Sequence, residues 1–351
     1  MPPEQTMLPE KTMLPESAMP APQTVSADNA EPKAAASEGS REASREAARA
    51  AALKSAGEVK VPPHSSRWGD MWASLASNKA ALVGMIIIAL LVLIAVVLYV
   101  TQAMGIDLLP YDPNQANMEK AFIKPNAEHW FGTDQLGRDI FSRILDGTKI
   151  SLSVGVAAVA ISLTVGTILG AMGGFYGGRL DNLIMRLMDV ILSVPSILLA
   201  IAFMAAMGRG LDKAVLAIGL VSIPEYARIA RSCVMSVKAN DYIQAAIVTG
   251  DSNMRIIFRH ILPNITSPIV VRATLGISTA VLETAALGFL GLGVQPPFAE
   301  WGDMLARSRS FIFSAPHTLI FPGLAITLTV LAFNLFGDGL RDALDPRSRR
   351  R

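Results

Sequence analysis

Long apolar stretches alternate with shorter polar segments over most of the chain. Two of these stretches, 80–106 and 150–178, contain no charged residue. A bilayer core requires roughly 20 apolar residues in a helix, and both stretches exceed that length. The pattern predicts an all-α membrane protein with six spans, the third of them kinked by Pro195. The spans are expected at about 80–105, 150–175, 189–208, 213–233, 265–287 and 317–337.

The segment before the first span has a different composition. Residues 1–66 are dominated by Pro, Glu, Ala and Ser, and the sequence at 6–10 is repeated at 12–16. Such a segment can bury too little apolar surface to offset the entropy of ordering it. We therefore expect a disordered tail over 1–66.

A short amphipathic stretch connects this tail to the first span. Trp68, Trp72 and Leu75 fall on one helical face. Tryptophan favours the boundary between lipid and water, so an interfacial helix is predicted over 67–79. The alternative is that these residues are simply the start of the first span.

The distribution of lysine and arginine predicts the orientation of the spans. With both termini inside, the inner segments after the first span contain 12 basic residues and the outer segments contain 8. Basic residues concentrate on the cytoplasmic side of membrane proteins. The terminal run Arg347-Ser-Arg-Arg-Arg351 has the same implication. We therefore expect a multi-pass protein with both termini, and the tail, in the cytoplasm.

Composition narrows the class of protein further. Hydrophobic residues make up 51% of the chain and charged residues 17%, whereas soluble domains have about a quarter charged residues. The net charge of +2 gives no argument for nucleic-acid binding. Cys233 is the single cysteine, which excludes an intrachain disulfide, and the four histidines lack metal-ligand spacing. With no Ser/His/Asp or Cys/His signature either, no catalytic residue and no metal site are expected.

Three glycines in the second span have a regular spacing. Gly166, Gly170 and Gly174 recur every four residues. Small residues at this spacing let membrane helices approach closely. We predict that this stripe is a helix-packing surface.

Ionisable residues inside spans are costly and usually functional. Arg272 and Glu283 lie eleven residues apart in the fifth span. At 1.5 Å per residue they share one helical face at a separation of about 16 Å. We predict that this face lines a translocation path, with Asp189 as a weaker candidate at the mouth of the third span. The alternative is that Arg272 extends to the inner interface and Glu283 pairs with another helix.

The first outer segment, 106–148, is rich in charge, with seven acidic and four basic residues. Four of its charged residues have the spacing of one helical face. We predict a salt-bridged structural helix there, in preference to a catalytic dyad. These four residues are Asp134, Arg138, Asp139 and Arg143.

A polar segment between the fourth and fifth spans carries the most informative spacing. Residues 242–250, Tyr-Ile-Gln-Ala-Ala-Ile-Val-Thr-Gly, are followed twelve residues later by Leu262-Pro263. The two adjacent alanines let a short helix fit deep into a groove on a partner. Gly250 permits a turn between two helices, and Pro263 suits the start of the next helix.

Three segments together strongly resemble the dipeptide/oligopeptide/nickel branch of ABC importer permeases. The resemblance is strongest to second (C-type) permease subunits of dipeptide importers, and it covers about 68–347. It implies a transmembrane permease domain of the type I ABC importer fold over 80–347, with a cytoplasmic coupling loop at 238–263. The three segments are His129-Trp-Phe-Gly-Thr-Asp-Gln-Leu-Gly-Arg-Asp-Ile-Phe-Ser-Arg143, the polar segment at 242–263, and Ala285-Ala-Leu-Gly-Phe-Leu-Gly-Leu-Gly-Val-Gln-Pro-Pro297 with Glu300-Trp-Gly302 and the closing stretch 334–346.

The resemblance assigns the coupling role to particular residues of this loop. Gln244 stands where the family pattern has an acidic residue, and His260 stands where the peptide branch also has histidine. The full set implied is Tyr242, Gln244, Ala245, Ala246, Gly250, His260, Leu262 and Pro263.

The resemblance also implies function and partners. The expected partners are a homologous second permease forming a heterodimer, two ABC ATPase subunits and an external solute-binding protein. Because a Walker A sequence is absent, we expect no cofactor on this chain, no enzymatic activity, and ATP hydrolysis by the partner subunits. The expected function is import of dipeptides or short oligopeptides through a bacterial inner membrane.

Other solutes and other classes of protein are the alternatives. Within the family, the solute could instead be nickel, glutathione or haem. Outside it, a secondary transporter or channel would need several midplane acids and paired repeats. An intramembrane hydrolase would need a nucleophile and base, or metal ligands, at membrane depth.

Overall fold

The computed structural model describes residues 67–344, and these are helical apart from loops, turns and an isolated bridge between Thr133 and Asp139. The predicted disordered tail over 1–66 and the arginine-rich C-terminal run lie outside the described residues, as does the end of the permease domain expected at 347. Within the described range, the prediction of an all-α membrane protein is confirmed.

Within residues 67–344, four helical segments are long and apolar enough to cross a membrane, or five if one sharply bent pair counts as a span, and the fourth predicted span is not among them. Helix α3 begins after Asn78, whose Oδ1 accepts the backbone N–H groups of Ala80 and Ala81. Helix α4 begins after Asp139, which caps it in the same way. The four segments are α3 (Lys79–Ala103), α4 (Ile140–Tyr176), the continuous segment Asn253–Phe289 that ends in α10 (Leu262–Phe289), and α12 (His317–Leu344).

Helix α2 (Arg67–Ser77) occupies most of the predicted 67–79 helix. It ends before Asn78 because Asn78 caps the next helix. Leu75 is buried with Ala81 and Ala343, whereas Trp72 is exposed. Leu75 therefore attaches α2 to the ends of α3 and α12.

The prediction for the third span is wrong in shape. Instead of one helix over 189–208 kinked at Pro195, the chain forms α5 (Gly178–Leu192) and α6 (Ser196–Met207), which meet at 88°. Proline has no N–H to continue a helix and disfavours helical backbone at the preceding residue. The chain therefore breaks completely and restarts with Pro195 as the N-terminal cap of α6.

Other predicted spans also differ in their bounds, and the sixth, expected over 317–337, continues to Leu344. The second was expected to begin near 150, but α4 begins at Ile140, because the polar turns that precede the apolar run are buried beneath outer loops rather than exposed to lipid. The fourth, expected over 213–233, is α7 (Leu211–Lys238), which runs through Pro224. Its charged second half keeps α7 below the apolarity of the other spans.

Helices α4 and α7 pack closely along the glycine stripe. A Cβ on Gly166 would lie 2.6 Å from the Cβ of Tyr226, and a Cβ on Gly174 would lie 2.9 Å from the carbonyl oxygen of Arg231. Gly170 faces the backbone of α7 even more closely. The predicted packing role of the stripe is confirmed, because any side chain there would separate the two helices.

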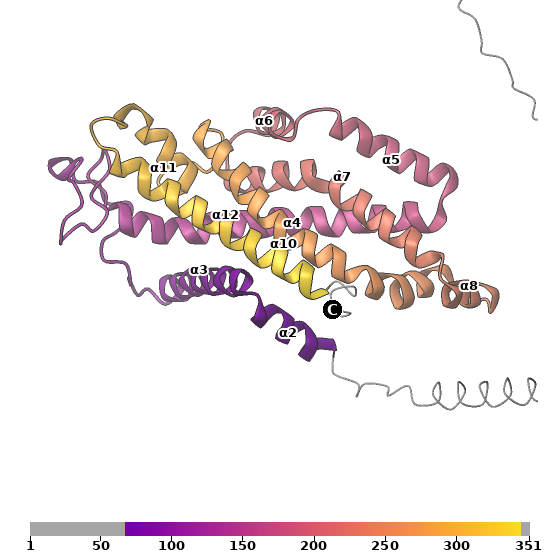
Figure 1. Ribbon diagram of the computed structural model, residues 1–351. Helices are drawn as coiled ribbons and strands as arrows, with labels where there is room; N and C mark the ends of the chain where they lie inside the picture. The colour runs from indigo at the N-terminus through magenta and orange to yellow at the C-terminus, as the bar shows by residue number, and fades with distance from the viewer. Residues whose placement is uncertain (1–66, 345–351) are drawn as a thin grey trace, which may run out of the picture. The chain divides into compact units, whose positions relative to one another are not determined.

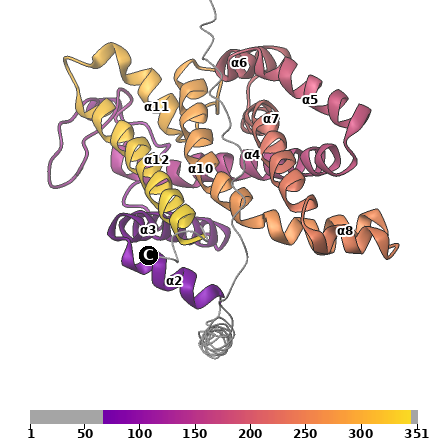
Figure 2. The same cartoon turned by 45° about the vertical axis from the view of Figure 1, so that its right-hand side comes forward.

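The segments predicted to lie outside the membrane fold against one end of the helices. They include η1 (Met118–Lys120), α11 (Trp301–Ser308) and η3 (Arg309–Phe311). The remaining short elements, α8 (Asp241–Val248), α9 (Asn253–Arg255) and the π-helical turn η2 (Ile256–Ile261), form the other end. Figures 1 and 2 both place α11 and α8 at opposite ends of the described part of the chain.

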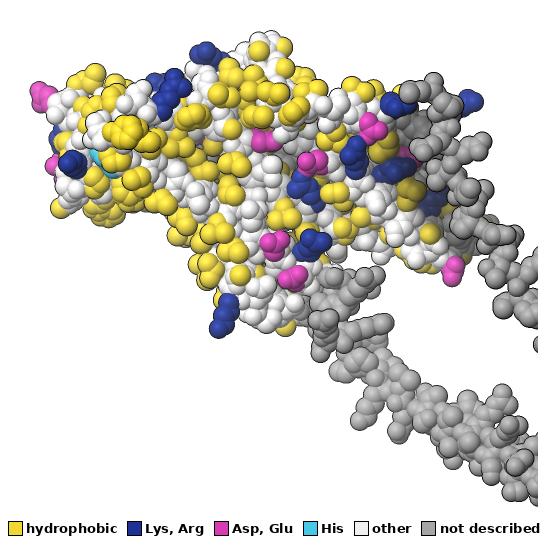
Figure 3. All heavy atoms as spheres, turned by 45° about the horizontal axis from the view of Figure 1, so that its top comes forward, with side chains coloured by type: hydrophobic (Ala, Val, Ile, Leu, Met, Phe, Trp, Pro, Cys, Tyr) yellow, Lys and Arg dark blue, Asp and Glu magenta, His cyan; other side chains and the backbone are white. Residues whose placement is uncertain are grey.

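The surface differs between these regions. In Figure 3, hydrophobic side chains cover much of the left and central parts, whereas charged side chains gather toward the right-hand part, where α5, α7 and α8 lie in Figure 1. On α3, Ile86, Leu90 and Leu93 are all exposed. Such apolar surface suits contact with lipid or with another membrane helix.

Candidate functional site

The predicted coupling loop is a short helix between two turns. Helix α7 ends at Lys238, α8 follows at once, and Gly250 then turns the chain with a φ of 85°. This left-handed conformation suits glycine, as the sequence predicted. The Oγ of Ser252 then accepts the N–H of Arg255 and starts the next helical segment.

Helix α8 is attached to the rest of the chain through one side. Ile243 is 0% exposed and packs in a cluster with Phe175, Val234 and Ile256. The opposite side presents Ala245, which is exposed, and Val248, which is 86% exposed. The helix thus presents a surface of small and apolar side chains that another protein could approach closely.

Hydrogen bonds fix the ends of this segment. The amide of Gln244 donates to the carbonyl oxygen of Lys238 at 2.9 Å, and Lys238 itself donates to the carbonyl of Phe175 at 2.6 Å. Asn264 donates both to the hydroxyl of Tyr242 and to the carbonyl of His260. The departure at Gln244 has a physical role here, because an ionised carboxylate has no proton to donate to Lys238.

Pro263 is the second residue of α10, close to the predicted start of the helix. The helical segment itself nevertheless runs without a break from Asn253 to Phe289, with η2 immediately before Leu262. Pro263 lacks an N–H and its ring would press on the carbonyl of Arg259, and the wider π turn accommodates it. The coupling segment is therefore continuous with the fifth predicted span.

Arg272 and Glu283 do share one face, as predicted, and both line a cavity of about 50 Å³. Its walls come from α4, α7 and α10 and from both sides of the α5–α6 break. Glu283 and Ser196 also line this cavity. The cavity could hold a few water molecules but not a peptide.

Two residues that the sequence analysis did not select complete this site. Glu225 forms an ion pair with Arg272, and the Tyr226 ring lies 5.6 Å from the Arg272 guanidinium. The Tyr226 hydroxyl is buried without a hydrogen-bond partner in the described part of the chain. The sequence signal for Glu225 was an acidic residue that follows the apolar stretch 214–223 and Pro224. Its pairing with Arg272 on another helix could not be predicted from the sequence.

Asp189 is not part of this cavity. It pairs with Arg228 of α7 at 2.6 Å, and both side chains are 53% exposed. On the same helix, Asp181 accepts two hydrogen bonds from Arg231. These pairs join α5 to α7.

The charged outer segment is paired but not helical, contrary to the prediction. Asp134 and Arg138 lie in a loop before α4, where they pair at 2.7 Å, and Asp139 is the N-cap of that helix. The reason is that Gly132 and Gly137 adopt positive φ, which turns the chain back on itself. Arg143, within α4, lies 3.8 Å from Asp134.

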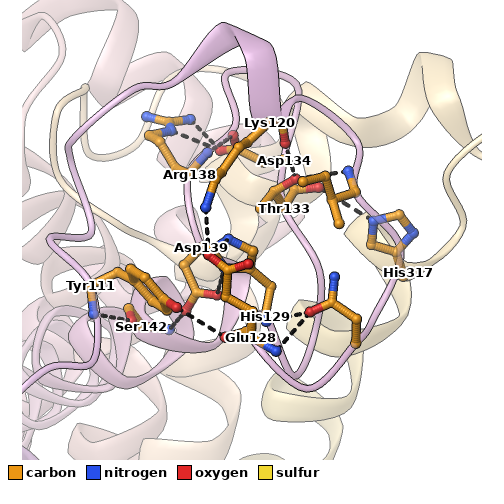
Figure 4. A network of polar contacts seen from close by, with 12 residues as sticks. Tyr111, Lys120, Glu128, His129, Thr133, Asp134, Arg138, Asp139, Ser142 and His317 are labelled. Atoms are coloured by element: carbon orange, nitrogen blue, oxygen red, sulfur yellow. Dashed lines mark hydrogen bonds and ion pairs between the residues drawn. The ribbon is translucent and has the colours of Figure 1, made fainter.

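The same segment brings a serine, a histidine and an aspartate together (Figure 4). His129 Nδ1 lies 2.9 Å from Asp139, whose other oxygen accepts the backbone N–H of Ser142 at 2.8 Å. The Ser142 hydroxyl accepts the N–H of Tyr111. The Ser142 hydroxyl accepts a backbone hydrogen bond and Asp139 caps the helix. The three residues therefore join the loop to α4, and the serine is not activated as a nucleophile.

An exposed ion pair borders this network. Lys120 and Glu128 approach to 2.5 Å. The hydrogen bond between them raises the pKa of Lys120 and lowers that of Glu128. Both groups therefore stay charged over the physiological range.

Comparisons with known proteins give concordant results. Residues 149–350 match the family described as binding-protein-dependent transport system inner membrane component, and residues 66–125 match the N-terminal TM domain of oligopeptide transport permease C. The chain is 50% identical to the dipeptide transport system permease protein DppC of Alkalihalophilus pseudofirmus, over 81% of this chain and 91% of the relative.

Two further relatives are similar over a comparable length. The di/tripeptide transport system permease protein DppC of Pseudomonas aeruginosa is 45% identical, over 79% of this chain and 91% of the relative. The glutathione transport system permease protein GsiD of Pectobacterium atrosepticum is 46% identical, over 80% and 91%.

Proposed function

This chain belongs to the family of binding-protein-dependent transport system inner membrane components, and from that premise we propose that it is a permease subunit of an ATP-driven importer of dipeptides or short oligopeptides. The 50% identity to a dipeptide permease over 81% of the chain is the observation that carries the proposal. It is a multi-pass inner-membrane protein by family and by its apolar helices.

Glutathione is the second candidate solute. The relative named for glutathione transport is 46% identical, close to the value for the di/tripeptide relative. Glutathione is itself a short peptide with free charged termini, so both candidates present similar chemistry to a transport route.

The proposed assembly places this chain beside a homologous permease in a heterodimer, with two ABC ATPases on the inner side and a solute-binding protein on the outer side. Both termini lie in the cytoplasm. The ATPases bind α8, on which Ala245 and Val248 are exposed and Ile243 is buried against the rest of the chain. This chain binds no cofactor, and ATP is hydrolysed by its partners.

Movement of α8 can be transmitted directly to the membrane-spanning helices. The segment Asn253–Phe289 is one continuous helix, so a displacement of its inner end also displaces Arg272 and Glu283. We infer that closure of the ATPases rocks this helix and opens the route that the two charges line. There, Arg272 binds the carboxylate of a zwitterionic peptide and Glu283 binds its ammonium group.

The assembly is tested by affinity purification from detergent-solubilised membranes, with mass spectrometry of the proteins that co-purify. The expected result is recovery of two ATPases and a second membrane permease. Recovery of this chain alone, as a stable homo-oligomer without an ATPase, would overturn the proposal in favour of a channel or secondary transporter.

The route is tested by uptake of labelled dialanine after the double substitution Arg272→Gln and Glu283→Gln. The expected result is loss of most uptake while the chain remains in the membrane. The matched control is Asp189→Asn with Arg228→Gln, which removes an exposed pair outside the cavity and should leave uptake nearly unchanged. Unchanged uptake in the first variant would remove both residues from the route.

A further inference from the structure

Arg272 lies between two cavities. One, called the upper cavity here, is the small cavity that also contains Glu283 and Ser222. The other, called the inner cavity, has a volume of about 480 Å³ and is lined by residues nearer the inner ends of α7, α10 and α12, including Ser267 and Arg341. Arg272 lines both, so its side chain stands at the boundary between them.

Two successive residues of α7 hold the Arg272 side chain at this boundary. Glu225 pairs with its guanidinium, and the aromatic ring of Tyr226 lies 5.6 Å from it. The ion pair therefore bridges α7 and α10. The side chain of Arg272 is 24% exposed and that of Glu225 is 47% exposed, so the pair is neither fully buried nor free on the surface.

We propose that the pair between Glu225 and Arg272 is a removable barrier that closes the passage from the upper cavity to the inner one. This inference rests on the proposed transport function and specifies how its route is kept shut. Separating the pair within the membrane leaves two uncompensated charges, which favours the closed state. Because Arg272 is on the helix that continues from the coupling segment, while Glu225 is on α7, relative movement of these two helices opens the barrier.

The barrier is tested by the accessibility of two introduced thiols. Ser222→Cys reports on the upper cavity and Ser267→Cys on the inner cavity, each in a Cys233→Ala background. Inside-out membrane vesicles containing the complete transporter are treated with membrane-impermeant methanethiosulfonates, one anionic and one cationic. Using both charges separates a change in access from a change in local potential.

The expected result is slow reaction of the Ser222→Cys thiol while the ion pair is intact. Glu225→Gln should accelerate that reaction by roughly tenfold with both reagents, because the uncharged amide no longer holds Arg272. The exchange of both charges, Glu225→Arg with Arg272→Glu, should slow it again. The Ser267→Cys thiol should react at the same rate in every background.

Equal Ser222→Cys rates in all backgrounds would overturn the barrier. A parallel rise in the Ser267→Cys rate would also overturn it, because it would indicate general loosening of the helices. If Glu225→Gln fails to accumulate, Glu225→Asp, which keeps the charge on a shorter side chain, provides the weakened pair.

The outcomes for barrier and function are distinct. Failure of the transport proposal would appear as absent dialanine uptake and absent ATPases with the unmodified chain. Failure of the barrier would appear as thiol rates that ignore the ion pair while uptake and assembly are intact.

Discussion

The end of the described chain that holds α11, here called the outer end from its predicted side, and the end that holds α8, called the inner end, use polar residues in opposite ways. At the outer end, charged side chains are buried and paired, as with Arg143, which is 1% exposed and donates to the carbonyl of Pro113. At the inner end, α8 is exposed on most sides and attached mainly through Ile243. The outer end is therefore fixed by buried polar pairs, whereas α8 at the inner end is attached mainly by one apolar side chain, which fits the proposed contact with the ATPases.

The largest expected difference between the two ends is in the free energy of unfolding that is lost when one arginine is removed at each end. Arg143→Ala removes a buried guanidinium and its bond to Pro113, and should lower the free energy of unfolding by about 3–5 kcal/mol. Arg255→Ala removes an exposed partner of Asp251 and should cost less than about 1 kcal/mol. Thermal unfolding in detergent and the amount of chain in the membrane are the measurements. Equal losses in the two variants would contradict the contrast.

The next largest effect concerns the anchor of α8. Ile243→Ala should weaken the attachment of this helix by about 2–4 kcal/mol, because Ile243 is fully buried. We expect lower ATP hydrolysis by the purified complex and less co-purified ATPase, with little change in unfolding of the remaining helices. Val248→Ala, on the same helix but 86% exposed, is the control for stability. A large fall in the overall unfolding temperature, with ATPase binding intact, would refute the anchor role.

A smaller effect is expected from the pH dependence of the outer end. Glu300 caps α11 by accepting the N–H groups of Gly302 and Asp303, and burial raises its pKa from 4.5 to about 7. Because the pKa of Glu300 is higher in the folded chain than in the unfolded chain, the folded chain binds one more proton than the unfolded chain between pH 4.5 and about 7. The contribution of Glu300 to stability is therefore present below pH 4.5 and lost as the pH rises toward 7.

Glu300→Gln should remove this dependence. The melting temperature of the variant should fall less than that of the unmodified chain between pH 5 and 7, by about a few degrees. Gln244→Ala, at the inner end, is the control and should leave the slope unchanged. An identical slope in the Glu300 variant would contradict the raised pKa.

The smallest effect is expected at Gln244. Gln244→Glu replaces the donor to the Lys238 carbonyl with a carboxylate, and should weaken the local structure by about 1 kcal/mol. Uptake should decrease slightly, and Gln244→Ala should behave similarly because it also lacks the donor. Unchanged hydrogen exchange at the end of α7 in both variants would show that this bond does not matter.

Features that depend on nearby residues could be predicted from the sequence. The long apolar runs gave the helices, the four-residue glycine spacing gave the close packing of α4 and α7, and Gly250 gave the turn after α8. The shared face of Arg272 and Glu283 also followed, because it needs only helical geometry.

Features that depend on residues far apart in the sequence could not be predicted from it. The pairing of Arg272 with Glu225 joins two helices, and the hydrogen bond from Trp301 to the carbonyl of Ile144 joins residues 157 positions apart. The break at Pro195 is an intermediate case. Proline signalled a kink, but the 88° angle depends on how α5 and α6 pack against the other helices.

We propose that this chain carries short peptides through the membrane and is coupled to the ATPases at α8. The most direct test is uptake of labelled dialanine by cells lacking only this chain, after restoring either the unmodified chain or Ala245→Arg. We predict that the unmodified chain restores uptake and that Ala245→Arg, which places a long charged side chain on the exposed surface of α8, does not, although it reaches the membrane in equal amount. Full uptake without the chain, or full uptake with Ala245→Arg, would contradict the account.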